Sequence, residues 1–184
     1  MTDILEKEYQ NALHEPSDIN EHLGLLKSLA DEVVHVTEMG TRAGTSTRAF
    51  LASNVILRSY DIALNERVKE LFLIAKRCGK DVEYIEADVL NLNIEETGLL
   101  FIDTWHCYEQ LIQELRLHAH KAKKYLVFHD TQTYGTVGEE IGDKKGTNGL
   151  LPAIIHYMIE NPNTWQFKIH RTNNNGLTVL ERIK

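Results

Sequence analysis

Two pairs of side chains in this sequence combine carboxylates with imidazoles, and each pair follows a short apolar run. Asp103 and His106 belong to the first pair, and His129 and Asp130 to the second. If the two apolar runs are neighbouring parallel strands, their carboxyl ends bring Asp103 and Asp130 within reach of one ion. Hard oxygen ligands suit Mg²⁺ or Mn²⁺, and a histidine ligand at position 129 shifts the preference toward Mn²⁺ or Fe²⁺. This edge is therefore a candidate divalent-metal site, and whether a metal is required stays open.

A glycine-punctuated turn at residues 39–44 follows another apolar run and opens a segment with a helical pattern. Gly40 and Gly44 permit a tight turn and a close approach of the backbone to a ligand, and the start of a helix offers free N–H groups. Arg42 stands where the middle glycine of a dinucleotide-binding turn belongs, which disfavours a pyrophosphate site. Glu38, directly before the turn, is badly placed beside a phosphate and well placed beside a cation.

Two further acids end apolar runs. Asp61 follows the turn by roughly twenty residues, where an acid can accept hydrogen bonds from both hydroxyls of a ribose. Asp88 ends the next run, and its carboxylate can receive an exocyclic amine. Glu38, Asp61 and Asp88 are all expected at the carboxyl ends of parallel strands, which is the edge where open α/β sheets bind their ligands.

The elements that must position these residues alternate between apolar runs and amphipathic segments. Strands are expected at residues 33–38, 55–61, 82–88, 98–103 and 125–130. Helices are expected at residues 45–52, 65–78, 108–122 and 149–160. This alternation predicts a parallel sheet covered by helices on both faces.

The end of the chain has a different pattern. Residues 165–171 and 177–182 flank an Asn-rich turn and predict an antiparallel β-hairpin. The fold class is therefore α/β, a Rossmann-like three-layer sandwich with a mostly parallel seven-stranded sheet and a C-terminal antiparallel β-hairpin. Residues 131–148 form a long irregular stretch, and a loop of that length is typically functional; we expect it to cover the site at the carboxyl edge of the sheet and exclude water from it.

The first 32 residues are helical and polar in pattern, and Ser17-Asp18 is typical of the cap that starts a second helix. We therefore expect a single domain overall, in which residues 1–32 are an N-terminal helical cap and residues 33–184 form the main α/β domain.

The series Glu38-x-Gly40-x-x-x-Gly44-x-Ser46, followed by Asp61 and Asp88, resembles the class I S-adenosylmethionine-dependent methyltransferases. The nearest resemblance is to small-molecule O-methyltransferases of the catechol O-methyltransferase-like and macrocin types, and it covers about residues 30–184. It implies that Glu38, Gly40 and Gly44 surround the methionine part of the cofactor, that Asp61 holds the ribose and that Asp88 lies by the adenine. The residues expected to bind the cofactor are Glu38, Gly40, Thr41, Gly44, Thr45, Ser46, Asp61, Asp88 and Asp103.

The resemblance also assigns chemistry to the two Asp/His pairs. Residues 103–106 match the Asp-x-x-His motif of the macrocin-type enzymes, in which the Asp and a later acid pair bind a divalent metal and the His is the general base. It implies that Asp103, His106 and His129 are catalytic. The implied ligands of a Mg or Mn ion are Asp103, His129 and Asp130. His129 departs from the acid expected at its position, which leaves two alternatives: a weaker metal site, or a metal-free site with His129 as a second base.

The expected function is transfer of a methyl group from S-adenosyl-L-methionine to a hydroxyl of a small molecule. A nucleic-acid methyltransferase is disfavoured, because no Asn/Asp-Pro-Pro-aromatic motif follows the fourth predicted strand. A nicotinamide dehydrogenase is disfavoured, because Arg42 stands where the turn of such an enzyme has its middle glycine. A non-catalytic cofactor-binding module stays open, and the missing carboxylate at position 129 is its best support.

The composition of the chain limits the kinds of molecule that it is expected to bind. The 184 residues carry 20 Lys+Arg and 27 Asp+Glu, a formal net charge of −7, which counts against nucleic acid and anionic membranes as partners. No apolar run approaches the ~20 residues needed to cross a bilayer, and the acidic N-terminus does not resemble a secretory signal. Two cysteines do not make a disulfide framework. We therefore expect a cytoplasmic protein; association with further copies of the chain stays open.

Overall fold

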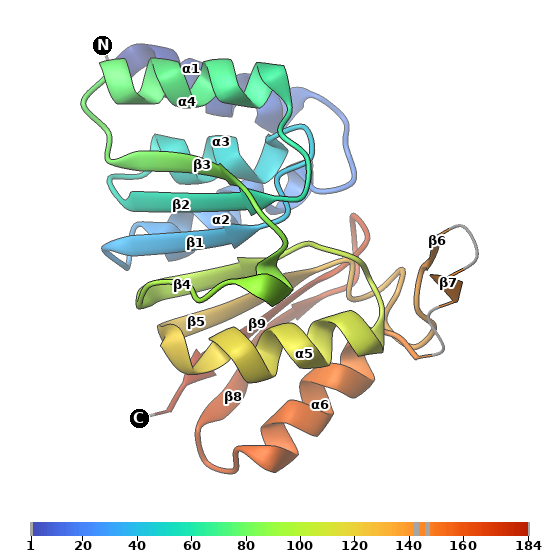
Figure 1. Ribbon diagram of the computed structural model, residues 1–184. Coiled ribbons are helices and arrows are strands. Elements are labelled where there is room, and N and C mark those ends of the chain that lie inside the picture. Colours follow the sequence, from blue (N-terminus) through green and yellow to red (C-terminus); the bar gives the residue numbers. More distant parts are fainter. Residues whose placement is uncertain (1, 142–143, 146–147, 184) are drawn as a thin grey trace.

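Seven strands form one sheet in the computed structural model, which describes residues 2–141, 144–145 and 148–183 (Figure 1). Their order is β3-β2-β1-β4-β5-β9-β8. The strands are β1 (His35–Met39), β2 (Ile56–Asp61), β3 (Val82–Glu86), β4 (Thr97–Ile102), β5 (Ala122–His129), β8 (Trp165–Arg171) and β9 (Leu177–Arg182). The first five are parallel, and β9 runs antiparallel to both β5 and β8. The predicted Rossmann-like sheet with a C-terminal antiparallel hairpin is confirmed.

The register of the central strands determines which residues meet at the carboxyl edge. Ile102 at the end of β4 pairs with Met39 of β1 and with Phe128 of β5. The residues that follow these three positions, Gly40, Asp103 and His129, therefore leave the sheet at the same level. The chain order also reverses between β1 and β4, and ligands bind at such a switch point in open α/β sheets.

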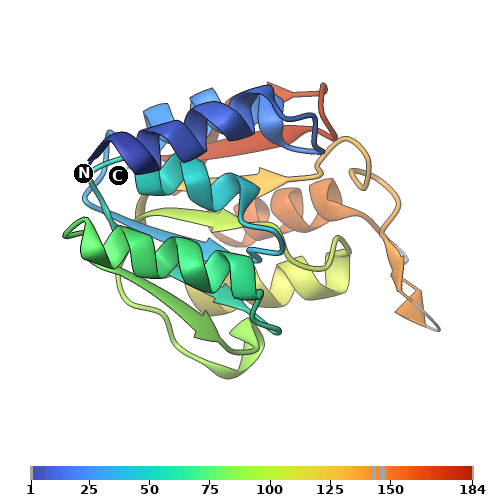
Figure 2. The same ribbon diagram turned by 90° about the horizontal axis from the view of Figure 1, so that it is seen from above.

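Helices cover both faces of the sheet (Figures 1 and 2). One face carries α1 (Thr2–His14), α2 (Leu23–Ala30), α3 (Thr45–Ala52) and α4 (Glu66–Arg77), and the other carries α5 (Tyr108–His118) and α6 (Leu150–Glu160). Side chains alternate across each strand, so Val36 and Phe101 belong to the core under the first layer while Met39 and Ile102 belong to the core under the second.

The N-terminal segment is part of the first helix layer, because α1 and α2 both pack on α3. Between them the chain makes a short 3₁₀ turn, η1 (Asn20–His22). The hydroxyl of Ser17, just before this turn, accepts hydrogen bonds from the backbone N–H of Ile19 and of Asn20 at 3.3 and 3.0 Å. The second helix itself begins at Leu23 with His22 at its N-cap, so the predicted Ser17-Asp18 cap does not start it. Among the described residues, no helix is both long and apolar enough to cross a membrane.

Several element boundaries differ from the sequence prediction. The third strand ends at Glu86, so Asp88 lies beyond it and caps the 3₁₀ turn η2 (Val89–Asn91). The helix predicted to run to residue 122 ends at His118 and is followed by η3 (Ala119–Lys121) and directly by β5. The stretch predicted to be irregular contains a two-stranded antiparallel ribbon, β6 (Glu140–Ile141) and β7 (Lys144–Lys145); residues 142, 143, 146 and 147 lie outside the described residues.

Candidate active site

The glycine turn brings the backbone of β1 against that of β4. Gly40 has φ +86°, and a Cβ added there would lie 2.0 Å from the carbonyl oxygen of Asp103. Only glycine permits both the conformation and this approach. Gly44 has φ +72° and precedes the first turn of α3. Arg42 also has a positive φ, 44°, although it has a side chain.

Asp61 stabilises this turn from β2. Its Oδ2 accepts hydrogen bonds from the backbone N–H of Thr41 and of Arg42 at 2.9 and 2.8 Å, and from the Thr41 hydroxyl at 2.9 Å. From the described residues its Oδ1 accepts one hydrogen bond, from Ala63 N–H at 3.2 Å. Burial opposes ionisation, but the backbone donors outweigh it and lower the pKa of Asp61. The carboxylate is thus charged and fixed, with Oδ1 the less occupied oxygen.

Glu38 lies beneath the turn and is fully buried. Its carboxyl accepts hydrogen bonds from the hydroxyls of Ser46 at 2.6 Å, Thr47 at 2.9 Å and Ser59 at 2.5 Å. Burial raises the pKa of Glu38 to about 7, although the three hydroxyl donors act against this. Glu38 therefore joins β1, β2 and the first turn of α3.

A cavity of about 560 Å³ opens at this edge of the sheet, within the size range of small-molecule sites. Of the residues predicted to bind a cofactor, it is lined by Gly40, Asp61, Asp88 and Asp103. Arg42, Ile62, Trp105 and Glu139 are further lining residues.

The other predicted cofactor residues lie elsewhere in the described structure. Thr45 lines a separate hollow of about 240 Å³ between the end of α1 and the start of α4. Glu38, Thr41, Gly44 and Ser46 are not among the residues that line the large cavity. The hydroxyls of Thr41 and Ser46 are bonded to Asp61 and Glu38 instead. These residues shape the turn, and direct ligand contact by them stays a prediction.

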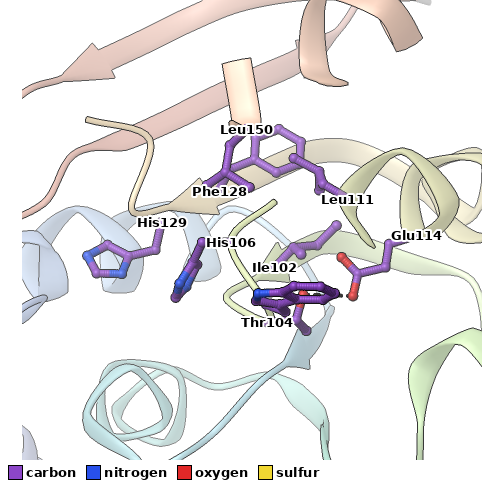
Figure 3. A pocket seen from close by; sticks show the side chains of 9 residues that line it. Ile102, Thr104, His106, Leu111, Glu114, Phe128, His129 and Leu150 are labelled. Atoms are coloured by element: carbon purple, nitrogen blue, oxygen red, sulfur yellow. Dashed lines mark hydrogen bonds between the residues drawn. The ribbon is translucent and has the colours of Figure 1, made fainter. Parts of the chain in front are cut away.

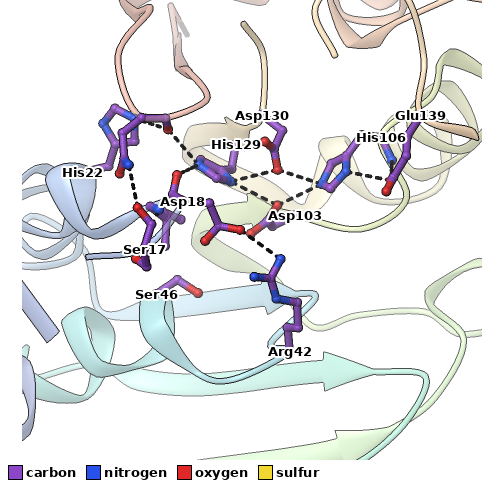
Figure 4. Close-up of polar contacts among 12 residues, drawn as sticks. Ser17, Asp18, His22, Arg42, Ser46, Asp103, His106, His129, Asp130 and Glu139 are labelled. Atoms are coloured by element: carbon purple, nitrogen blue, oxygen red, sulfur yellow. Dashed lines mark hydrogen bonds and ion pairs between the residues drawn. The ribbon is translucent and has the colours of Figure 1, made fainter. Parts of the chain in front are cut away.

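Asp103, His106, His129 and Asp130 form one group, here called the His–Asp cluster (Figure 4). Nε2 of His106 lies 3.1 Å from Oδ1 of Asp103 and 3.0 Å from Oδ2 of Asp130. Nδ1 of His129 lies 3.3 and 3.1 Å from the same two oxygens. Both imidazoles therefore bridge the same pair of carboxylates. The parallel strands predicted that Asp103 and Asp130 lie close together; they did not predict this bridging by the imidazoles.

The outer nitrogen of each imidazole has its own acceptor. Nδ1 of His106 lies 2.9 Å from Oε2 of Glu139. Nε2 of His129 lies 3.0 Å from the carbonyl oxygen of Asp18 and 3.3 Å from that of Asn174. Because a carbonyl only accepts, Nε2 of His129 must carry a hydrogen, and Nδ1 is turned toward the carboxylates.

The charges of the cluster reinforce one another. Burial lowers the pKa of a histidine, but Asp103 and Asp130 outweigh it: they raise the pKa of His129 to about 10 and also raise that of His106. In turn, hydrogen bonds from the two imidazoles lower the pKa of Asp103 despite its burial. Both imidazoles are thus favoured in the protonated form in this arrangement.

The donor set also fits a divalent cation. One ligand atom each from Asp103, His129 and Asp130 lie within 4.8 Å of one another. Oδ1 of Asp130 is buried and has no hydrogen-bond partner among the described residues. Metal-binding histidines characteristically donate their outer N–H to a carbonyl or carboxylate, as His129 does here.

Behind the cluster, Glu114 of α5 holds the segment that follows β4 (Figure 3). Glu114 is fully buried, and its Oε1 accepts hydrogen bonds from the Thr104 hydroxyl at 2.7 Å and the Gln110 amide at 2.8 Å. Burial raises the pKa of Glu114 to about 7. A hollow of only about 10 Å³ lies between Glu114, Trp105 and His106, so the cluster is closely packed on this side.

Sequence reasoning missed the outer partners of the cluster. Glu139 lies in the stretch expected to cover the site, but no spacing marked it as a partner of His106. Asp18 was grouped with Ser17 as a helix cap. Asn174 was assigned to a turn, which is correct, while its contact with His129 depends on how distant segments pack.

No protein-family model matches the sequence, and no curated protein matches it in sequence. Solved structures do match in fold. N-methyltransferase NodS from Bradyrhizobium japonicum WM9, in complex with S-adenosyl-L-homocysteine, has a TM-score of 0.65 at 15% identity, over 99% of this chain and 98% of that one. Magnesium protoporphyrin IX methyltransferase ChlM from Synechocystis PCC 6803, with the same molecule bound, has a TM-score of 0.64 at 9% identity over 96% and 93%.

An O-methyltransferase family protein from Burkholderia thailandensis gives a TM-score of 0.66 at 10% identity, over 89% of this chain and 55% of that one. At these identities the likeness establishes the fold. The chain has the Rossmann-like fold that these methyltransferases share.

Proposed function

We propose that the protein is an S-adenosylmethionine-dependent methyltransferase that methylates a hydroxyl group of a small molecule, with help from a divalent cation. The observation that carries this proposal is the position of Asp103. Asp103 lines the large cavity and also belongs to the His–Asp cluster. A methyl donor in the cavity would therefore lie next to groups that bind an acceptor and remove its proton.

The lining of the cavity suits the donor. Asp61, Asp88, Asp103 and Glu139 contribute carboxylates, which attract a positively charged sulfur centre. Asp61 has one carboxylate oxygen with spare capacity for a ribose hydroxyl, since the glycine turn occupies mainly the other. S-Adenosylmethionine supplies an already activated methyl group, so the protein needs chiefly to align the reactants and take a proton.

The His–Asp cluster suits the acceptor. Asp103, His129 and Asp130 would hold the cation, whose charge lowers the pKa of a bound hydroxyl. With both carboxylates so engaged, their hold on a proton at His106 weakens. Nε2 of His106 can then accept the hydroxyl proton, and Glu139 at Nδ1 stabilises the resulting imidazolium. A weakly acidic hydroxyl needs such a base to remove its proton. A base in the position of His106 therefore favours a hydroxyl over an amine as the acceptor.

The test is methyl transfer from labelled S-adenosylmethionine to a panel of sugars, phenols and amines, with Mn²⁺, with Mg²⁺ and with a chelator. The proposal predicts label on a hydroxyl-bearing acceptor, with turnover reduced by the chelator. Transfer only to amines would overturn O-methylation, and transfer unaffected by the chelator would overturn the cation. Cofactor binding without transfer to any acceptor would instead favour a non-catalytic module.

A further inference from the structure

Arg42 is the only cationic side chain among the described residues that line the large cavity. The charged groups that accompany it there are the carboxylates Asp61, Asp88, Asp103 and Glu139. The negative charge of these carboxylates attracts a sulfonium, but the carboxylates themselves cannot pair with a carboxylate of the ligand. The donor assigned under the proposed function carries an α-carboxylate at the end of its amino-acid arm. One cation at the cavity is what that group requires.

The backbone holds Arg42 at the cavity while its side chain stays free to move. Arg42 has φ +44°, and its N–H donates to Oδ2 of Asp61 at 2.8 Å. Its side chain, in contrast, is 82% exposed. The side chain therefore starts from a fixed position in the glycine turn and can adjust to a ligand.

The guanidinium already holds a carboxylate. Its Nη1 lies 2.9 Å from Oδ2 of Asp18, and Figure 4 shows the side chain reaching from the glycine turn toward Asp18, near Asp103. An ion pair with such an exposed partner contributes little to stability, so a ligand carboxylate can replace Asp18 at low cost. Arginine binds carboxylates through paired N–H groups, which makes it more selective than a lysine here.

We propose that Arg42 is the residue that recognises the α-carboxylate of the methyl donor, and that Asp18 occupies the guanidinium while the cavity holds no donor. This inference rests on the proposed function. Asp61 and Asp88 would then face the nucleoside, Asp103 the sulfur, and Arg42 the amino-acid end. The selectivity of the cavity for a nucleoside with an amino-acid arm would depend on this single side chain.

The test compares two sulfur nucleosides by calorimetric titration: S-adenosylhomocysteine, which has the amino-acid arm, and 5′-methylthioadenosine, which lacks it. Arg42→Ala should weaken S-adenosylhomocysteine binding by about tenfold or more, the usual cost of losing a hydrogen-bonded charged partner, and leave methylthioadenosine binding unchanged. Arg67→Ala, which removes an exposed arginine outside the large cavity, should change neither. Asp18→Asn should bind S-adenosylhomocysteine at least as tightly as the wild type.

Each other outcome overturns the inference. Equal losses for both ligands in Arg42→Ala would show that the residue shapes the turn. No loss for either would show that the carboxylate is bound elsewhere. If Asp18→Asn weakened S-adenosylhomocysteine binding as much as Arg42→Ala does, the Arg42–Asp18 ion pair itself would be needed for binding. Asp18 would then not be a partner that the ligand carboxylate replaces. A wild-type protein that binds neither nucleoside would overturn the proposed function itself, and this inference with it.

Discussion

His106 is held at both nitrogens by carboxylates, with Asp103 and Asp130 at Nε2 and Glu139 at Nδ1. This geometry aims Nε2 at the place where the acceptor hydroxyl is proposed to lie. His106→Ala should therefore reduce turnover by about 10²–10⁴, the usual contribution of general-base catalysis. Affinity for S-adenosylhomocysteine should stay near that of the wild type, because His106 is outside the cavity lining. Steady-state kinetics and titration check this, and unchanged turnover would remove His106 from the mechanism.

Glu38 makes stability depend on pH. Its pKa is about 7 in the folded protein against an ordinary value of 4.5. As the pH rises, Glu38 therefore loses its proton in the unfolded chain before it does so in the folded protein. Between about pH 4.5 and 7 the folded state binds more protons than the unfolded state, so the free energy of unfolding falls as the pH rises through this range. The expected decrease in the free energy of unfolding is up to about 3 kcal/mol for this group.

Glu38→Gln should flatten this part of the curve, as measured by urea unfolding between about pH 4.5 and 7. Glu114→Gln should flatten the same part of the curve as a second, independent case, because burial raises the pKa of Glu114 in the same direction and to the same value. A variant whose unfolding free energy keeps the full slope would show that Glu38 ionises normally in the folded protein.

At the scale of elements, the approach of β1 to β4 depends on Gly40. A side chain there would meet the Asp103 carbonyl at 2.0 Å in a backbone with φ +86°. Gly40→Ala should therefore destabilise the fold by several kcal/mol, or displace Asp103 and abolish cofactor binding. Gly79→Ala is the matched control: φ is +81°, but no atom lies within 4 Å of the added Cβ. It should cost only about 1 kcal/mol. Equal effects of the two changes on thermal unfolding would contradict the close approach.

The elements themselves were readable from the sequence because buried strands are apolar runs and surface helices are amphipathic. All seven strands of the main sheet and the helices between them were predicted, and the common edge of Asp61, Asp103 and Asp130 followed from the parallel arrangement. The residues at which helices and strands end were predicted less accurately. Asp88 was assigned to a strand but caps a 3₁₀ turn through Leu90 N–H, a local choice that an apolar run does not reveal.

The site was predictable in its inner part and not in its outer part. Asp103, His106, His129 and Asp130 share one edge, which spacing and topology determine. Glu38, Thr41 and Ser46 were expected to contact the cofactor. In the structure, the hydroxyls of Thr41 and Ser46 instead donate hydrogen bonds to the carboxyl groups of Asp61 and Glu38, which the sequence pattern did not predict. Glu139 joins the cluster through the ribbon-bearing stretch, whose path depends on tertiary packing.

At the scale of the molecule, segments from the two ends of the chain meet behind His129. The Asn174 side chain accepts a hydrogen bond from Glu21 N–H at 3.0 Å and donates one to the carbonyl of Ser17 at 2.7 Å. The carbonyls of Asp18 and Asn174 in turn hold Nε2 of His129. The N-terminal segment and the β8–β9 turn thus orient a residue of the cluster together.

Asn174→Gly should therefore lower the free energy of unfolding by about 1–2 kcal/mol through the two lost hydrogen bonds. It should also speed the exchange of the Nε2 hydrogen of His129 with solvent in NMR spectra. Asn175→Gly is the matched control, since Asn175 also has a positive φ of 66° but its side chain makes no hydrogen bond within the described residues. If both variants leave the exchange of that hydrogen unchanged, the two ends of the chain do not hold His129.

The most direct measurement is a calorimetric titration of the wild-type protein with S-adenosylhomocysteine, paired with the same titration of Gly40→Ala. Saturable binding of one molecule per chain, lost or strongly weakened in the variant, is expected if the acidic cavity beside Asp103 is the donor site. No binding to the wild-type protein, or equal binding to both, would contradict this assignment of the cavity.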